Sequence, residues 1–147
     1  MPLHQRTRRL LDYLSVGWFS TCVLQIVFNE ISAAEISRMD TLDQLELLDA
    51  FRVSESDLVE LDDNDEHRNF GKIARDGKTL YRFRANDCRI YFEVAEDLVI
   101  VHRVLHKNTF SDFLFRSKMP VSEDEQLAES KHFWKLIDEG RNARRME

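Results

Sequence analysis

The stretch Leu80-Tyr-Arg-Phe-Arg-Ala-Asn-Asp-Cys-Arg-Ile-Tyr-Phe-Glu-Val94 decides how this chain folds. Two runs of aromatic and branched residues flank Asn86-Asp87, a dipeptide that suits a two-residue hairpin turn. That turn places Arg84 directly opposite Arg89. Side chains alternate between the two faces of a strand, so the hairpin has one apolar and one cationic face. The apolar face is predicted to contain Tyr81, Phe83, Ile90 and Phe92, and the cationic face Arg82, Arg84, Arg89 and Tyr91.

A third strand is predicted at Leu98–His106, after a second short turn. Regular pairing with the hairpin places His102 beside Tyr91, so that His102 and His106 join the cationic face. The same alternation puts Arg103 on the apolar face, a position for which the sequence offers no reason.

The segments before the hairpin predict a strand and two helices. Val23–Phe28 is short and rich in branched residues, as a strand is. Two capping-box patterns, Ser32 with Glu35 and Thr41 with Gln44, each predict the start of a helix. The predicted buried stripes are Ala33, Ile36 and Met39 in the first helix, and Leu42, Leu45, Leu48 and Phe51 in the second.

After Pro120, a further capping box of Ser122 and Glu125 predicts a C-terminal helix that packs on its own domain. The order strand, helix, helix, three antiparallel strands, helix predicts an α+β fold. The first strand is expected to join the three-stranded meander in one twisted sheet. The predicted organisation is an N-terminal extension at 1–22, either helical or disordered, a domain at 23–120 and a helix at 121–147.

Composition is that of an ordinary soluble chain, with 43% hydrophobic and 33% charged residues among 147. Cys22 and Cys88 form no CxxC pair, and no clean cleavage site follows the N-terminal apolar stretch, so a reducing, cytoplasmic location is expected. Residues 30–65 carry 12 acids and 2 bases, whereas residues 66–119 carry 11 bases and 7 acids. The second of these segments is suited to meet phosphate.

The opposed arginines are the strongest chemical signal. Like charges directly opposite on a sheet repel, and an anion such as RNA phosphate would relieve the repulsion. The alternative is that Glu93, or an acid from residues 53–66, neutralises them on a solvated surface. His102, beside Tyr91 and near Arg89, is placed to act as a general acid or base. No metal site and no cofactor is predicted.

The segment from Gly71 through Leu80–Val94, followed by Val99-Ile-Val-His-Arg-Val-Leu-His-Lys107, resembles the RelE/ParE toxin superfamily. Members typically show an L-Y-R-L-R-x-G-D-Y-R-x-x-Y/F-E-V segment, a hydrophobic strand and then L-x-H-R/K. The resemblance runs from about Val23 to Pro120. It implies a RelE-like α+β fold and, in RelE-like members, cleavage of mRNA in the ribosomal A site by attack of a 2′-hydroxyl on the adjacent phosphate.

The resemblance also implies roles for residues and partners. The expected partners are a cognate antitoxin protein, the ribosome and mRNA, with no membrane and with DNA met only through an antitoxin complex. Phe110, Phe113 and Phe115 stand where many RelE-like nucleases carry a tyrosine, and Cys88 replaces a common tyrosine. A ParE-like gyrase inhibitor and a non-catalytic binding module therefore remain as alternatives. The predicted catalytic residues are Arg84, Arg89, His102, His106 and Tyr91, and the predicted RNA-binding residues are Arg82, Lys107, Lys78 and Phe110.

Overall fold

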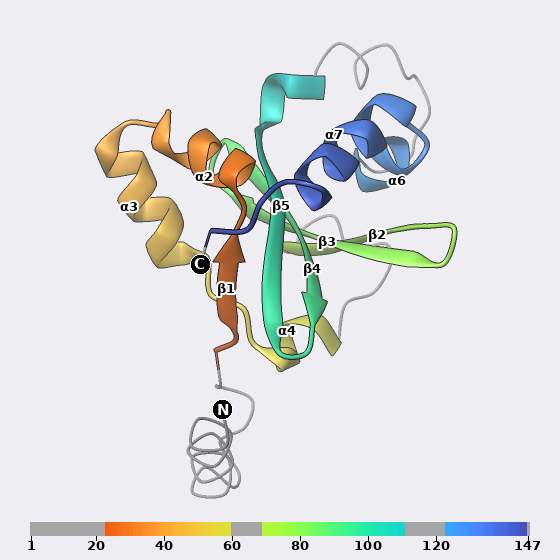
Figure 1. Cartoon of the computed structure of the whole chain (residues 1–147), viewed down its shortest axis with the longest axis horizontal. Coiled ribbons are helices and arrows are strands. Elements are labelled where there is room, and N and C mark those ends of the chain that lie inside the picture. The colour runs from red at the N-terminus through yellow and green to blue at the C-terminus, as the bar shows by residue number, and fades with distance from the viewer. Residues whose placement is uncertain (1–22, 60–68, 111–122, 147) are drawn as a thin grey trace, which may run out of the picture.

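The computed structural model describes residues 23–59, 69–110 and 123–146. These residues form an α+β fold around one five-stranded sheet, with strand order β1-β5-β4-β3-β2 (Figure 1). The elements are β1 (Gln25–Phe28), α2 (Glu30–Ser37), α3 (Thr41–Ala50), α4 (Glu55–Val59), β2 (Phe70–Arg75), β3 (Lys78–Ala85), β4 (Cys88–Ala95), β5 (Leu98–His106), the 3-10 turn η2 (Lys107–Phe110), α6 (Glu123–Ala128) and α7 (Lys131–Arg141).

The sheet is mixed. β1 pairs parallel with β5, and β2 to β5 form an antiparallel meander. The sequence predicted a meander of three strands, so β2 is an addition to that prediction. It pairs with β3 through a turn at Asp76-Gly77, where both residues have positive φ angles, 53° and 78°. The α+β class and the union of β1 with the meander in one sheet are confirmed.

A first core lies on the face of the sheet that carries Phe83, Ile90 and Phe92, and Phe51, directly after α3, packs into it. The Phe51 ring centroid is 5.2 Å from that of Phe83 and 5.5 Å from that of Phe92. The predicted apolar face of the hairpin is therefore correct, since its four residues all belong to this core or pack against it.

The predicted buried stripe of α3 is wrong apart from Phe51. Leu42, Leu45 and Leu48 are 67%, 61% and 46% exposed, whereas Leu47 is 5% exposed. A helix with leucines at four positions carries two overlapping stripes of helical spacing, and periodicity alone cannot choose between them. Packing of Phe51 between two strand phenylalanines selects the side that also buries Leu47.

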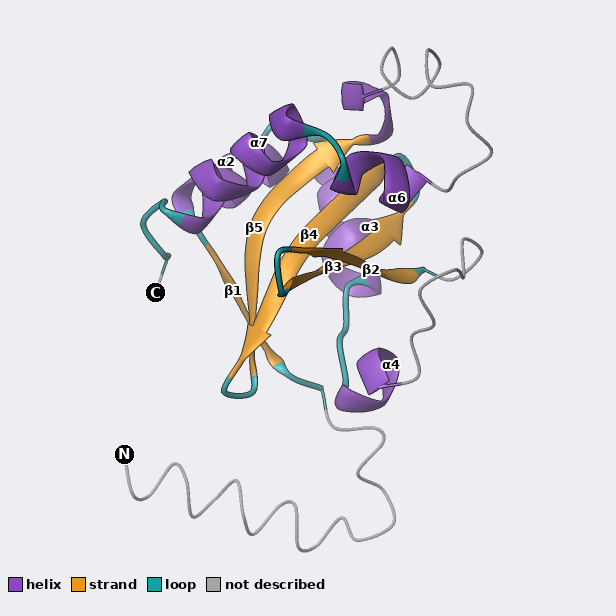
Figure 2. Cartoon of the chain, turned by 90° about the vertical axis from the view of Figure 1, so that its right-hand side faces the viewer, coloured by secondary structure: helices purple, strands orange, loops and turns teal. Residues whose placement is uncertain are grey.

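A second core lies on the opposite face, beneath α6 and α7 (Figures 1 and 2). The C-terminal segment was predicted as one helix and forms two, because α6 ends at Ala128 and Ser130 caps α7 by accepting a hydrogen bond from the Phe133 N–H at 3.2 Å. Its packing on its own domain is confirmed. The apolar members of this core are Ile73, Leu80, Tyr91, Leu105, Leu127, Phe133, Trp134 and Ile137.

A β-bulge in β5 changes the predicted face of several residues. The pairing of β4 with β5 is regular from the pair Ala95 and Leu98 to the pair Phe92 and Val101. Tyr91 then pairs with Arg103, so His102 is the additional residue of the bulge and has no partner on β4 in this register. The predicted Tyr91–His102 pair is therefore wrong. The sequence predicted Arg103 on the apolar face, where a charged residue had no explanation. In the structure Arg103 lies on the same face of the sheet as Tyr91, away from the first core.

The bulge also turns the end of β5. His106 pairs with Cys88, whose side chain packs against the first core, so His106 lies on the face opposite to the arginines. Its predicted place on the cationic face is wrong because one extra residue inverts the alternation beyond it.

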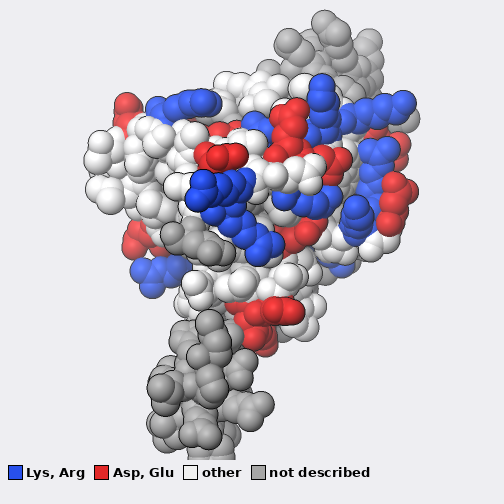
Figure 3. Space-filling model, viewed as in Figure 1, with Lys and Arg blue, Asp and Glu red and all other residues white. Residues whose placement is uncertain are grey.

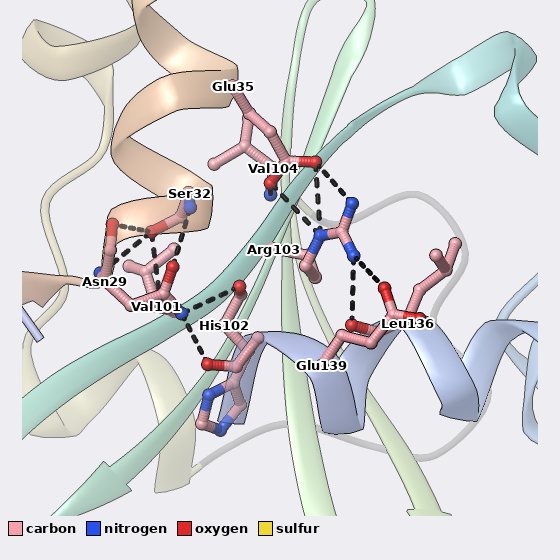
Figure 4. Close-up of polar contacts among 10 residues, drawn as sticks. Asn29, Ser32, Glu35, Val101, His102, Arg103, Val104, Leu136 and Glu139 are labelled. Carbon is pink, nitrogen blue, oxygen red and sulfur yellow. Dashed lines mark hydrogen bonds and ion pairs between the residues drawn. The ribbon is translucent and has the colours of Figure 1, made fainter. Parts of the chain in front are cut away.

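The bulge is held by Asn29, which precedes α2 (Figure 4). Its side-chain Nδ2 donates to the carbonyl oxygens of Val101, His102 and Gly140 at 3.1, 3.0 and 2.7 Å. Its Oδ1 accepts from the Ser32 N–H at 2.7 Å, while Ser32 Oγ accepts from the Asn29 N–H at 3.0 Å. The sequence pattern predicted a capping box that begins at Ser32. In the structure it begins at Asn29.

The predicted capping box of Thr41 and Gln44 is wrong, although the helix itself is present. α3 starts after Asp40, which makes no side-chain capping hydrogen bond, and Gln44 Nε2 donates to the Met39 carbonyl oxygen at 2.8 Å.

Arg103 ties α2, β5 and α7 together (Figure 4). Its guanidinium lies 2.9 Å from a Glu35 carboxylate oxygen and 3.4 Å from a Glu139 oxygen, and it donates to the Leu136 carbonyl oxygen at 3.2 Å. Gly140 then allows α7 to approach β5 closely, because a Cβ there would lie 2.1 Å from the His102 carbonyl oxygen. α7 is thus an integral part of the domain.

Candidate anion-binding site

Three arginines lie in a row on the sheet face beneath α6 and α7. The observed register pairs Arg82 with Tyr91 and Arg84 with Arg89, as the hairpin predicted. Alternation along β3 and β4 then directs Arg82, Arg84 and Arg89 to one face. The site is built from this row and from the acidic first turn of α6.

Arg82 is fully buried in an ion pair. Its Nη2 lies 2.8 Å from Asp124 Oδ2, its Nε donates to Asp124 Oδ1 at 3.1 Å, and its Nη1 donates to the Asn69 carbonyl oxygen at 2.9 Å. Gly71, opposite Arg82 on β2, leaves room for the guanidinium, since a Cβ there would lie 2.1 Å from Nη2. These contacts give Arg82 a structural role in this conformation.

Arg84 and Arg89 share one carboxylate at the end of the row. The distances to Glu123 oxygens are 4.0 Å from Arg84 Nη2 and 3.7 Å from Arg89 Nε. The side chains are 33% exposed for Arg84, 11% for Arg89 and 26% for Glu123, so this end of the row reaches solvent. The sequence analysis offered Glu93, or an acid from residues 53–66, as the group that neutralises Arg84 and Arg89. Among the described residues, the carboxylates beside these two arginines come from α6.

The electrostatic balance at Arg84 favours a further anion. Burial, followed by repulsion from Arg82 and Arg89, lowers the pKa of Arg84, and these effects outweigh the opposing influence of Glu123 and Asp124. A negatively charged ligand at this end would raise that pKa again and would be bound more tightly for that reason.

Tyr91 and His102 are enclosed. Tyr91 is 1% exposed and packs edge-on against Phe133, with ring centroids 5.0 Å apart, and burial raises its pKa. His102 is 3% exposed, and its Nε2 lies 3.5 Å from Glu93 Oε2. Burial lowers the pKa of His102 despite that carboxylate, which also pairs with Arg141. Neither residue can touch a ligand while α6 and α7 are in place.

The remaining predicted residues lie outside this cluster. His106 lines a pocket of about 320 Å³ between α3 and the β3–β4 turn, together with Asp43 and Cys88. Lys107, at the start of η2, lies 3.0 Å from Asp87 and lowers the pKa of that carboxyl group. Lys78 is exposed at the start of β3. The side chain of Phe110, and all of Phe113 and Phe115, are outside the described part of the chain.

Sequence reasoning missed the two acids that complete the site. Glu123 and Asp124 stand in the first turn of α6, where acids are common because they suit the helix dipole. Residues 82 and 124 are 42 positions apart, and no local pattern links them. Figure 3 shows acidic and basic side chains interleaved over the α6–α7 side of the face in view.

The buried His102 makes stability depend on pH. Because the pKa is lower in the folded protein than its ordinary value of about 6.5, the unfolded chain binds the proton more readily. Above about pH 6.5 His102 does not make the free energy of unfolding depend on pH. Below that pH the free energy of unfolding falls as the pH decreases, by up to about 1.4 kcal/mol per pH unit. Urea unfolding between pH 5 and 7.5 measures this slope.

His102→Gln is expected to flatten that dependence. The same exchange at His132, exposed on α7, controls for the loss of a histidine elsewhere. Identical slopes for wild type and His102→Gln would contradict the assignment of a neutral buried imidazole.

No protein-family model, curated protein or solved structure matches this chain. Within residues 23–59, 69–110 and 123–146, no helix combines the length and apolar character needed to cross a membrane. The same ranges contain no group of three or more His, Cys, Asp or Glu side chains positioned to hold a metal ion.

Proposed function

We propose that this protein is a toxin of the RelE/ParE type that stops translation by cutting mRNA on the ribosome in the cytoplasm, and that a cognate antitoxin protein silences it. The observation that carries the proposal is the opposed pair Arg84 and Arg89, which share Glu123 at a solvent-accessible end of an arginine row. The order of β1, α2, α3 and the meander also agrees with the expected order of a RelE-like fold.

The arginine pair suits a phosphoryl centre. In the proposed reaction a 2′-oxygen attacks the adjacent phosphorus, the bond from phosphorus to the 5′-oxygen breaks, and a cyclic phosphate and a 5′-hydroxyl result. Negative charge grows on the non-bridging oxygens, where two guanidiniums held at fixed positions stabilise it. RNA phosphate would displace Glu123 from the pair, because both anions compete for the same N–H groups.

Proton transfer sets a structural condition on this mechanism. The 2′-hydroxyl must lose a proton and the leaving 5′-oxygen must gain one. The three groups predicted to transfer these protons are Tyr91, His102 and His106. Of these, Tyr91 and His102 are buried on the side of the sheet that α7 covers. Their participation therefore requires α7, which packs on Tyr91 through Phe133 and reaches the Glu93 partner of His102 through Arg141, to move away from the sheet. Without such a movement, the described carboxylate closest to the arginine pair is that of Glu123.

Primer extension on mRNA bound to ribosomes with an empty A site tests the proposal. Wild-type protein is expected to cut within the A-site codon, and Arg89→Ala is expected to slow cutting by about 10²- to 10³-fold, because it removes a donor to the transition-state charge. Arg52→Ala is the matched control, since Arg52 is an exposed arginine that lies remote from the row and pairs with Asp49 at the end of α3.

A second variant separates binding from cutting. Glu123→Gln removes the competing charge while retaining the shape, so it is expected to tighten binding of a short RNA measured by fluorescence anisotropy. An absence of cleavage by folded wild-type protein on active ribosomes would overturn the nuclease proposal.

The second candidate is a non-catalytic mode of action, either ParE-like inhibition of DNA gyrase or a binding module. The enclosure of Tyr91 and His102 favours it, because two of the three predicted proton-transfer groups are then unused. Inhibition of gyrase supercoiling, together with intact mRNA in the ribosome assay, would favour the ParE-like mode.

A further inference from the structure

α3 presents an apolar surface that no described residue covers. Leu42, Leu45 and Leu48 follow one another at intervals of three residues on the side away from the first core, and all three are exposed. We refer to these three residues as the leucine face. In Figure 3 the α3 side, at the left, is mostly uncharged surface edged by charged atoms. Adjacent exposed leucines on a helix mark a surface that receives another segment.

The surroundings of the leucine face are acidic. Asp43, Glu46 and Asp49 are exposed along the same helix, and Asp40 precedes it. Arg52 pairs with Asp49 at 3.4 Å at the C-terminal end. A second copy of this chain packed face to face would bring these acids against their equivalents, which is unfavourable. The occupant must therefore combine an apolar stripe with cationic side chains.

The first 22 residues have this chemistry. Arg6, Arg8 and Arg9 precede Leu10, Leu14 and Trp18, which recur at intervals of four residues. In a helix that spacing aligns the three apolar side chains on one side, and a helix over residues 7–20 is one of the two forms that the sequence allows for the N-terminal extension. It would be about 21 Å long, compared with about 15 Å for α3.

The segment is also attached close to the leucine face. Val23 forms a β-bridge with Ser54, and the Leu24 N–H donates to the Val53 carbonyl oxygen at 2.7 Å, three residues after α3 ends. A short tether of this kind gives an effective concentration in the millimolar range, higher than that of a separate partner.

We propose that residues 7–20 form an amphipathic helix that packs in cis on the leucine face, with its arginines beside the acids of α3. The function of such a contact would be to keep the leucines of α3 out of water. This inference does not depend on the toxin proposal, because it rests on the exposure and charge of α3 and on the composition of the first 22 residues.

Disulfide trapping in the full chain tests this contact. Leu14→Cys and Leu45→Cys are introduced together after Cys22→Ser and Cys88→Ser remove the two native thiols. Copper–phenanthroline serves as the oxidant that takes up the two electrons. The control replaces Val16, on the opposite side of the predicted helix, with cysteine in place of Leu14. Circular dichroism checks that each variant is folded.

The Leu14–Leu45 pair is expected to form an intramolecular disulfide about tenfold faster than the Val16 control, because a disulfide requires Cα atoms within about 7 Å. Adding Asp43→Lys and Glu46→Lys should slow the reaction by weakening attraction to the arginines. Equal rates for Leu14 and Val16, or disulfide-linked dimers at low protein concentration, would overturn the proposal, and the dimers would point to a second copy as the occupant.

Discussion

Replacing Asn29 with alanine is expected to lower the free energy of unfolding by about 3–5 kcal/mol, a large share of the stability of a small domain. The change removes the helix cap of α2, worth about 1 kcal/mol. It also removes the Nδ2 donor from three buried carbonyl oxygens, those of Val101, His102 and Gly140. Urea unfolding at pH 7, followed by circular dichroism, measures the loss.

Asn29→Asp separates these two contributions. Aspartate is as good a cap as asparagine, but its carboxylate would face the three carbonyl oxygens and has no N–H to donate. It is expected to cost at least as much as alanine. Ser130→Ala, which removes only the cap of α7, serves as a reference and should cost about 1 kcal/mol. A well-tolerated Asn29→Asp would show that the cap alone matters.

Asp124→Asn is expected to cost about 3–5 kcal/mol, because it leaves the guanidinium of Arg82 buried without its counter-charge. The Arg82 side chain is 1% exposed, and its guanidinium donates three hydrogen bonds to the Asp124 carboxylate. Thermal and urea unfolding provide the measurement.

Glu123→Gln is a matched control for that change, since it removes one charge from the adjacent residue of the same helix. Its side chain is 26% exposed and stands 3.7 Å or more from its arginine partners, so a cost within about 1 kcal/mol is expected. Arg82→Leu combined with Asp124→Leu should recover much of the loss, as apolar replacement of buried pairs often does. Similar costs for Asp124→Asn and Glu123→Gln would refute the distinction between a buried pair and a surface one.

The hairpin of β3 and β4 could be predicted from sequence down to its register. Its two faces differ completely in character and its turn has two residues, so a slip by one residue would direct the arginines into the first core and the phenylalanines to the opposite face. β2 was accessible in principle, because Asp76-Gly77 is among the strongest hairpin dipeptides. Its alternation is weak, however, with Gly71 and Lys72 early in the strand.

The second half of β5 could not be predicted in the same way. A bulge leaves no distinct mark in composition, and its one sign was the misplaced Arg103. The true capping residue of α2 was equally hidden, since Asn29 follows a strand directly and its partners are distant carbonyl groups. These features arise from tertiary contacts, which local patterns do not encode.

The candidate site was predicted in part. The arginine row follows from alternation, and the structure brings Arg82, Arg84 and Arg89 together on one face as expected. Their burial could not be foreseen, because it depends on α6 and α7 and on the aspartate and glutamate that α6 contributes. His106 left the predicted cluster through the bulge alone.

The hydrogen bonds of Asn29 also determine when the domain can be finished during synthesis. Its three acceptors lie 72, 73 and 111 residues further along the chain. At cellular rates of translation, roughly 6–20 s separate the appearance of Asn29 from that of Gly140. In the first part of that interval, until Leu98–His106 has been made, β1 has no β5 to pair with. The domain can therefore be completed only after synthesis has reached Gly140.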